Sequence, residues 1–318
     1  RKSCDIIYHI IEKELNQTNI VNREKWKKAS QQARDIRLEF SQTEEIDSKK
    51  LIENLSKDST VFTKFDSLGG LSFTSILDNY QSSDIVIKTN KLIDLKITRT
   101  PVENIHTMVN VYYKKDYETG EHIYKTGYCD GYDFYGNGEN NGDVLYQELD
   151  SNENIITKTK KGYDYSSLNL KREERILNYK SDYIRTKESA IMLRDYLYQF
   201  NCNQHTIIKC TLSVKDGIMM QVGDIVEFDE LYNNLKAYGE DYTKQNIRNG
   251  QIISPFFLIT SIAKSTKNIK IDCLQLHDLT PTFSAGKGSL SRKSEVGIHN
   301  FWQHFDSAEN ASLISPEE

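Results

Sequence analysis

The strongest constraint on the fold is a series of short apolar segments that follow one another closely between residues 206 and 277. These segments cover residues 206–213, 218–220, 225–229, 256–264 and 269–277. Each has the length of a β-strand, and Gly217 and Gly223 lie where the chain has to turn. Strands spaced this closely are typical of a small barrel or sandwich, which we expect for this part of the chain.

A helix and a long insertion accompany these strands. Residues 186–200 place Ala190, Leu193, Leu197 and Phe200 on one helical face. Residues 231–250 form a polar insertion between two strands, and loops of this length usually carry function or contacts. We therefore expect its tyrosines to contact a partner: Tyr232, Tyr238 and Tyr242.

The first hundred residues mix helices and strands. Apolar spacing predicts helices over residues 5–15, over 23–33 with Asn22 as the N-cap, and after Ser48. Residues 61–65 and 71–73 flank Gly69-Gly70 and predict a hairpin. A further pair of strands is expected around residues 85–87 and 95–98.

The middle of the chain is rich in strand signals and tyrosine. Residues 107–113 alternate as a strand, and a loop rich in Gly, Asn and Asp covers 130–143. Tyrosine suits protein interfaces and sugar-binding surfaces, but it also favours strands in general, so packing on a sheet face explains it as well. The tyrosines in question are Tyr112, Tyr113, Tyr117, Tyr124, Tyr128, Tyr132, Tyr135 and Tyr146.

From Pro281 onward, Ser, Gly, Lys and Asn dominate around one aromatic island, Phe301, Trp302 and Phe305. We interpret residues 281–318 as an extended arm with an aromatic anchor. Two interpretations of the anchor stay open: a partner covers it, or it packs back on its own domain.

These patterns predict an α+β, multidomain chain with a mixed α/β N-terminal domain and a β-barrel-like C-terminal domain. The expected divisions are 1–98, a β-rich domain at 99–185, the small barrel with its helix at 186–280, and the arm at 281–318. Because the sequence starts at Arg1 with neither Met nor a signal peptide, we expect it to be a fragment.

Charge and cysteine usage narrow the function classes. The chain carries 41 basic and 46 acidic residues, a net charge of −5, with no long basic block, so sequence-specific nucleic-acid binding is not indicated. A pore through which DNA passes needs only to avoid binding phosphate. No apolar stretch is long enough for a membrane span. The five dispersed cysteines contain no CxxC pair and predict free thiols.

One segment follows the spacing of a calcium-binding EF-hand loop: Asn137, Glu139, Asn141 and Glu148. The first position is Asn instead of Asp, the second ligand position is Glu, and residues 128–135 resemble a strand or turn instead of an entering helix. We therefore predict a hairpin loop there, with no metal and no cofactor.

Catalytic motifs are equally weak. Gly136-x-Gly138 lacks the lysine and helix start of a phosphate loop, and the seven histidines are scattered. The acidic pairs Glu44-Glu45 and Glu173-Glu174 hold adjacent residues, which point apart on a helix or strand. We predict no catalytic residues and no enzymatic activity, although the carboxylates are too numerous for the sequence to exclude an acid–base dyad.

Several phrases, in this order, resemble the hub or tail-tip proteins of bacteriophage tails. They are Gly69-Gly70-Leu71-Ser72-Phe73, Thr98-Arg99-Thr100-Pro101, Val109-Asn110-Val111-Tyr112-Tyr113, Leu212-Ser213-Val214, Val222-Gly223-Asp224-Ile225-Val226-Glu227-Phe228, Phe257-Leu258-Ile259-Thr260-Ser261-Ile262 and Ile269-Lys270-Ile271-Asp272. The resemblance covers most of residues 1–280.

The resemblance implies a structural virion subunit, made in the host cytoplasm and located in the virion tail. Such proteins form a threefold ring, here a homotrimer, that joins the tail tube protein to a central spike or fibre and surrounds the genome-ejection channel. DNA would pass without specific binding. The residues themselves leave two alternatives open: a virion-associated glycan-degrading enzyme, or a sugar-binding adhesion module suggested by the tyrosines.

Overall fold

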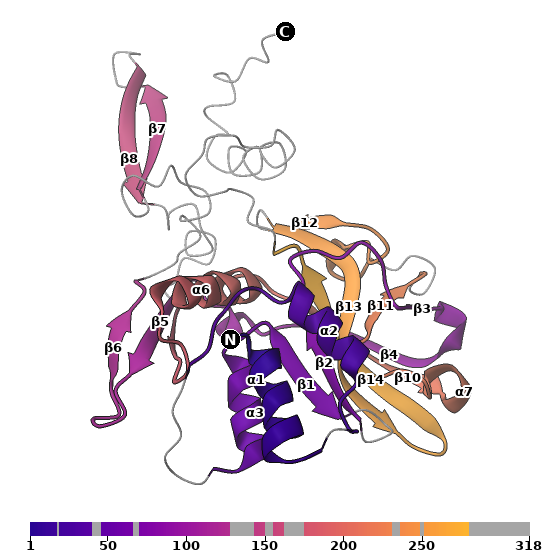
Figure 1. The fold of residues 1–318 in the computed structure, drawn as a ribbon. Helices are drawn as coiled ribbons and strands as arrows, with labels where there is room; N and C mark the ends of the chain where they lie inside the picture. The colour runs from indigo at the N-terminus through magenta and orange to yellow at the C-terminus, as the bar shows by residue number, and fades with distance from the viewer. Residues whose placement is uncertain are drawn as a thin grey trace.

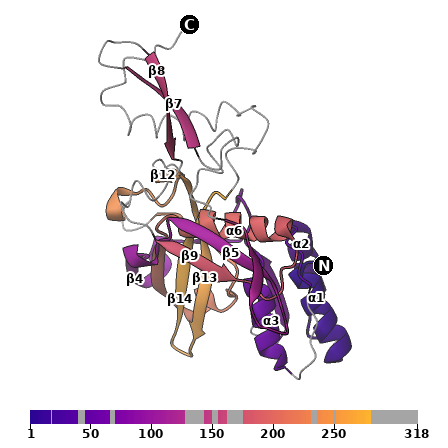
Figure 2. The ribbon, with the colours of Figure 1, turned by 90° about the vertical axis from the view of Figure 1, so that its left-hand side faces the viewer.

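The structure is a computed structural model that describes residues 1–17, 19–39, 46–65, 70–127, 143–149, 155–161, 175–230, 236–248 and 251–279. The expected α+β class is confirmed: a layer of helices and short strands lies beside a curled sheet (Figure 1). Turned by 90°, the view shows the first three helices on one side and the barrel strands on the other (Figure 2).

The curled sheet has seven strands, and six of them form one hydrogen-bonded path. In spatial order these are β3 (Ile85–Ile87), β11 (Ile225–Phe228), β13 (Gln251–Lys264), β14 (Asn268–His277), β10 (Thr206–Ser213) and β4 (Leu92–Arg99). The seventh, β12 (Asn246–Arg248), pairs with β13. Strands β3 and β4 therefore join a sheet whose other members come from residues 206–277.

Topology forces this sheet to curl. Strands β3 and β4 are its two outer strands, yet only residues 88–91 separate them in the chain. Five Cα steps reach at most about 18 Å, whereas the outer strands of a flat six-strand path lie about 24 Å apart. The expectation that residues 85–87 and 95–98 form a neighbouring pair is wrong, since each pairs with a distant strand: β3 with β11 and β4 with β10.

The inside of the curled sheet is apolar. Alternate residues of β10, β14 and β13 face it, among them Ile208, Leu212, Ile271 and Ile259, all 1% exposed or less. Phe228 meets Phe257 edge to face at 5.3 Å. The predicted free thiols are confirmed for Cys4, Cys210 and Cys273, which are buried.

The helical layer begins with α1 (Ser3–His9), which continues as a π-helical turn (Ile10–Glu14), followed by α2 (Arg23–Gln32) and α3 (Ser48–Lys57). Asn22 and Asp47 cap α2 and α3 through hydrogen bonds from the backbone N–H groups of Lys25 and Lys50, both 3.1 Å. The antiparallel hairpin of β1 (Val61–Phe65) and β2 (Leu71–Ser75) completes this part as predicted.

A second, three-stranded sheet carries β6 (His122–Lys125), β5 (Met108–Lys115) and β9 (Ile176–Lys180), in that order. Helix α6 (Lys187–Asn201) packs against β5. The backbone of β7 (Asp143–Leu149) pairs antiparallel with that of β8 (Ile155–Lys161). Short helical turns lie at Thr89–Lys91, Val102–Asn104, Val214–Gly217 (α7) and Ala237–Gly239.

Two local predictions are wrong. Residues 5–15 were predicted as one α-helix, but the α-helix ends at His9, residues 10–14 form a π-helical turn, and Leu15 is 41% exposed. Residues 218–220 were expected to form a strand, but the chain forms α7 and a turn there.

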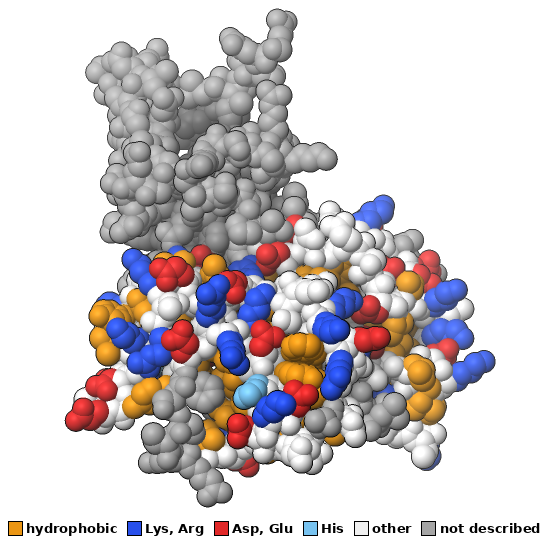
Figure 3. Space-filling view, viewed as in Figure 1, with side chains coloured by type: hydrophobic (Ala, Val, Ile, Leu, Met, Phe, Trp, Pro, Cys, Tyr) orange, Lys and Arg blue, Asp and Glu red, His pale blue; other side chains and the backbone are white. Residues whose placement is uncertain are grey.

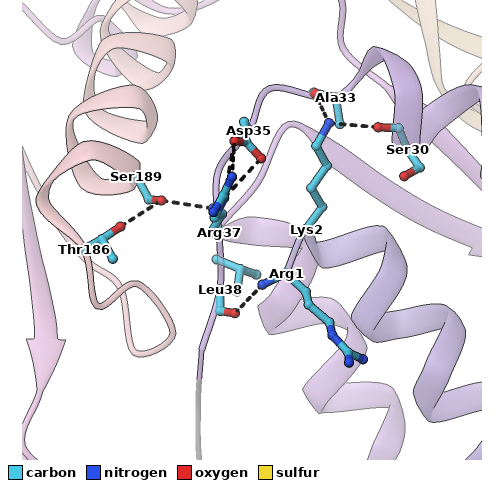
Figure 4. Close-up of polar contacts among 9 residues, drawn as sticks. All are labelled: Arg1, Lys2, Ser30, Ala33, Asp35, Arg37, Leu38, Thr186 and Ser189. Carbon is cyan, nitrogen blue, oxygen red and sulfur yellow. Dashed lines mark hydrogen bonds and ion pairs between the residues drawn. The ribbon is translucent and has the colours of Figure 1, made fainter.

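Polar contacts tie the first residues to two helices (Figure 4). The Lys2 ammonium donates to the carbonyl oxygens of Ser30 and Ala33, both 2.9 Å, where it satisfies the C-terminal end of α2. The Arg37 backbone N–H donates to Ser189 Oγ of α6 at 3.0 Å. These contacts hold α2 and α6 in one layer.

Two contacts join the helical layer to the curled sheet. Gly223, with φ +93°, lies so close to Thr74 of β2 that an added Cβ would stand 2.3 Å from Thr74 Oγ1. The Lys25 ammonium of α2 donates to Gln221 Oε1 at 3.1 Å. The loop that leads into β11 therefore contacts both β2 and α2.

Candidate assembly surfaces

One surface lies at the end of the barrel, where α7 turns the chain outward. The Ser213 hydroxyl caps α7 by accepting from the Asp216 backbone N–H. Gly217 lies against Ile269, where an added Cβ would be 3.1 Å away, so the following side chains are directed outward. Ile218 is 46% exposed and Met219 is 83% exposed.

Several lysines lie on or next to the turn that carries Ile218 and Met219. Lys264 Nζ donates to the Ile218 carbonyl oxygen at 2.6 Å, and Lys91 Nζ lies 3.2 Å from Asp216 Oδ1. Lys88, Lys215 and Lys267 are exposed. We call this surface the lysine knob; it consists of Ile218, Met219, Lys88, Lys91, Lys215, Lys264 and Lys267.

A second surface lies at the tip of the β5–β6 hairpin. The Asp116 carboxylate accepts hydrogen bonds from the Glu118 backbone N–H (3.0 Å) and from Thr119 Oγ1 (2.9 Å). These bonds hold the pKa of Asp116 below its usual value, so the group stays negative. Glu118 and Glu121 are exposed beside it.

Exposed apolar side chains accompany these carboxylates. Tyr117, Ile123 and Tyr124 are 49%, 54% and 49% exposed. The Arg185 guanidinium lies 5.4 Å from the Tyr117 ring, and the Lys114 ammonium lies 5.0 Å from the Tyr124 ring, so cations fix both rings from one side. We call residues 116–124 the acidic hairpin.

A third feature is the strained turn around Tyr238. Tyr238 and Gly239 both have positive φ, 58° and 78°, and the Glu240 backbone N–H donates to the Ala237 carbonyl oxygen. The Arg99 guanidinium stacks on the Tyr238 ring at 4.4 Å and pairs with Glu240 at 2.6 Å. Tyr238 is thus 55% exposed but held in one place.

A buried carboxylate lies between α3 and β9. Asp58 is 3% exposed and accepts hydrogen bonds from Tyr179 Oη (2.7 Å) and Ser181 Oγ (2.5 Å). Burial raises the pKa of Asp58 to about 6, against the lowering effect of these two donors. The arrangement is a structural tie, because Tyr179 lies in β9, Ser181 directly follows that strand, and the carboxylate belongs to the residue that ends α3.

The predicted contact tyrosines have different surroundings. Tyr238 is exposed as described, and its role as a contact stays a prediction. Tyr242 is a correction: it is 2% exposed, donates to the Ala237 carbonyl oxygen at 2.7 Å and packs near Phe257, so it belongs to the barrel core. The other predicted contact residues, Tyr232, Phe301, Trp302 and Phe305, lie outside the described residues.

The calcium candidate is largely outside the described residues as well. Asn137, Glu139 and Asn141 are not described, and Glu148 lies in β7, whose backbone is extended. Within the described parts, no group of three His, Cys, Asp or Glu side chains could hold a metal ion. None of the helices in those parts is both long and apolar enough to span a membrane.

Sequence reasoning missed both charged surfaces. The signal for the acidic hairpin was available in the acidic turn Asp116, Glu118 and Glu121 between two strand patterns. The lysine knob was obscured because residues 218–220 resemble a strand.

Comparisons with known proteins give structural likeness only. The sequence matches no protein-family model and no curated protein. The structure resembles the 43 kDa tail protein of prophage MuSo2 from Shewanella oneidensis, with a TM-score of 0.42 and 12% identity over 86% of this chain and 66% of that chain. It also resembles a tail protein from Neisseria meningitidis MC58, with a TM-score of 0.45 and 8% identity over 86% of this chain and 66% of that chain.

A protein in the virion of a native gene transfer agent particle gives a TM-score of 0.39 and 9% identity over 76% of this chain and 42% of that one. The chain thus spans slightly under two thirds of the two tail proteins, at 66% of each. These TM-scores are low, so the likeness by itself does not assign a function.

Proposed function

We propose that this chain is a structural, non-enzymatic subunit of a bacteriophage tail. In this proposal it forms a homotrimeric hub or tail-tip ring that links the tail tube protein to the central spike or fibre and surrounds the genome-ejection channel. One observation carries the proposal: four of the ordered phrases that resemble tail-hub proteins lie side by side on one curled sheet.

The register of the strands makes this concrete. Leu212 of β10 pairs with Ile269 of β14, and Ile225 of β11 pairs with Leu258 of β13. Ile262 of β13 pairs with Ile271 of β14. Residues from these separate phrases therefore pair with one another in the curled sheet.

A curled sheet with two edge strands suits a ring subunit for a physical reason. The two edge strands, β3 and β4, each pair with one neighbour only, so their free edges can pair with an adjacent subunit, which would remove the edge-pairing hazard in a ring. The mildly negative chain, at −5, also suits a channel that DNA crosses without binding.

The test is the location of the chain in particles that carry it. Antibody raised against residues 1–127, coupled to gold, should label the tail tip in electron micrographs. Label on the capsid, or no label on intact and disrupted particles, would overturn the proposal. If the purified chain hydrolyses host glycans, the glycan-degrading enzyme replaces this proposal. If it binds glycans saturably without hydrolysing them, the sugar-binding adhesion module replaces it.

A further inference from the structure

The lysine knob and the acidic hairpin lie at opposite ends of the molecule. Figure 1 places β6 at the left and α7 at the right, with the helical layer and the barrel between them. Figure 3 shows carboxylates on the tip at the left and several Lys or Arg side chains along the right edge. One chain therefore cannot bring the two surfaces together, but two copies can.

Charge makes the two surfaces complementary. Lys264 and Lys91 contact the turn through the Ile218 carbonyl oxygen and Asp216, and Lys215 belongs to α7. Lys267 precedes Asn268, the strand partner of Ser213, and Lys88 lies three residues before Lys91. Two acidic side chains lie beside these lysines: Asp216 is paired with Lys91, and Asp229 accepts a hydrogen bond from the Thr89 backbone N–H at 2.9 Å. The hairpin brings the carboxylates of Asp116, Glu118 and Glu121 into one turn. Opposite charges of this kind steer encounter and fix register.

Apolar contacts fit at the same places. Met219 is the most exposed large apolar side chain of the described residues, at 83%, and its thioether is flexible. Tyr117 and Tyr124 on the hairpin each present about half of their surface and have one face fixed by a cation. Sulfur–aromatic contacts are favourable, so Met219 packed against these rings would form the apolar centre of an interface with a charged rim.

We propose that the lysine knob of one copy binds the acidic hairpin of the next copy, head to tail. The occupant is a second copy of this chain, and this choice rests on the proposed ring function as well as on the charge match. Because the two patches differ, the contact is heterologous, and repetition of it closes a ring if the rotation between neighbours allows closure.

The first experiment uses engineered thiols. In a Cys129→Ser background, the variants Met219→Cys and Tyr117→Cys are purified separately and mixed under mild oxidation. Burial raises the pKa of Cys210 to about 12 and that of Cys273 well above its usual value, so these native thiols react slowly. The mixture should form a mixed disulfide at least ~10-fold faster than either variant alone.

The matched control is Met192→Cys, since Met192 is 40% exposed on α6 and belongs to neither surface. It should give only the background rate with Tyr117→Cys. Preferred self-pairing of Met219→Cys would indicate a twofold contact and overturn the proposal. A mixed rate equal to the control rate would also overturn it.

The second experiment reverses charges. Lys215→Glu/Lys267→Glu and Glu118→Lys/Glu121→Lys should each weaken self-association ~10-fold or more, because like charges then face each other. All four changes in one chain should restore it. Lys49→Glu/Lys50→Glu on α3 is the control for the lysine variant, since both change the net charge by the same amount. Mass by light scattering is the readout, and failure of the fourfold variant to recover would contradict the proposal.

A basic apolar loop could instead bind anionic lipid. Binding to vesicles with and without phosphatidylserine tests this outcome. If vesicle binding depends on Lys215 and Lys267 but not on Glu118 and Glu121, and no mixed disulfide forms, the lysine knob binds membranes. That result would overturn the head-to-tail contact. Failures of the two proposals remain distinguishable. Gold label at the tail tip without formation of the mixed disulfide would contradict only the head-to-tail contact. Formation of the mixed disulfide without gold label on the tail would contradict only the location of the ring in a virion.

Discussion

The curled sheet and the helical layer are held together in different ways. The barrel interior is filled by apolar and thiol side chains, such as Ile208, Phe257 and Cys273, all fully buried. The helical layer also has an apolar core, but its orientation depends on buried polar ties such as Asp58 to Ser181. The stability that comes from apolar packing inside the curled sheet does not depend on pH, whereas the stability that comes from a buried carboxylate does. The two regions should therefore respond differently to core mutation and to acid.

The largest effect is expected in the barrel core. Phe257→Ala should lower the free energy of unfolding by about 3–5 kcal/mol, because it removes a fully buried ring and leaves a cavity. Val102→Ala, at a 50% exposed position, should cost less than about 0.5 kcal/mol. Urea unfolding followed by circular dichroism gives both values.

The same variant sharpens the comparison between the two regions. In a Trp302→Phe background, Trp26 of α2 becomes the fluorescent probe of the helical layer, where it stacks on Tyr8 at 4.4 Å. If the contacts through Gly223 and Lys25 make the chain one cooperative unit, the fluorescence and circular dichroism transitions coincide. Separate transitions would show that the barrel and the helical layer unfold independently.

The contact between the two regions is tested by a pair of glycines. Gly223→Ala should cost about 2–4 kcal/mol, since it combines a left-handed backbone with overpacking against Thr74. Gly120→Ala has a similar φ of +75° but open space around it, and it should cost only about 1–2 kcal/mol. Thermal or urea unfolding measures the difference. Equal costs would mean that the approach of β2 to the barrel loop adds nothing to stability.

In the helical layer, Ser181→Ala should cost about 1–3 kcal/mol, because it leaves the buried Asp58 carboxylate with one donor fewer. Ser82→Ala, at an exposed position outside this network, is the control. A cost near zero would show that the polar tie does not orient this layer.

The smallest effect is the pH dependence. Burial raises the pKa of Asp58 to about 6, above the value of the unfolded chain, so the folded state binds more protons between about pH 4 and pH 6. This group therefore adds stability as pH falls and loses it as pH rises through about 6. Relative to Asp58→Asn, the wild type should gain about 1 kcal/mol between pH 7 and pH 5, measured by urea unfolding at both values. A flat or opposite difference would contradict the assigned environment of Asp58.

Local patterns predicted most elements of this fold. The N-cap Asn22, the β1–β2 hairpin and strands β10, β13 and β14 follow from spacing and turn chemistry. The curl could not be predicted, because it depends on β3 pairing in parallel with β11, some 140 positions later in the chain. The same applies to Asp58, whose donors Tyr179 and Ser181 are 121 and 123 residues away. Local periodicity carries no information on such distant pairs.

The short connection at residues 88–91 has a mechanical consequence. It joins the two outer strands of the curled sheet covalently, and it is fastened on one side to Asp229 through the Thr89 backbone N–H (2.9 Å) and on the other to Asp216 through Lys91. A pull that spreads those strands apart is therefore borne by backbone bonds, which do not yield as hydrogen bonds do. If the chain were cut at this connection, β3 and β4 would separate at a force that the intact chain resists. The connection therefore acts as a covalent cross-link between the two outer strands.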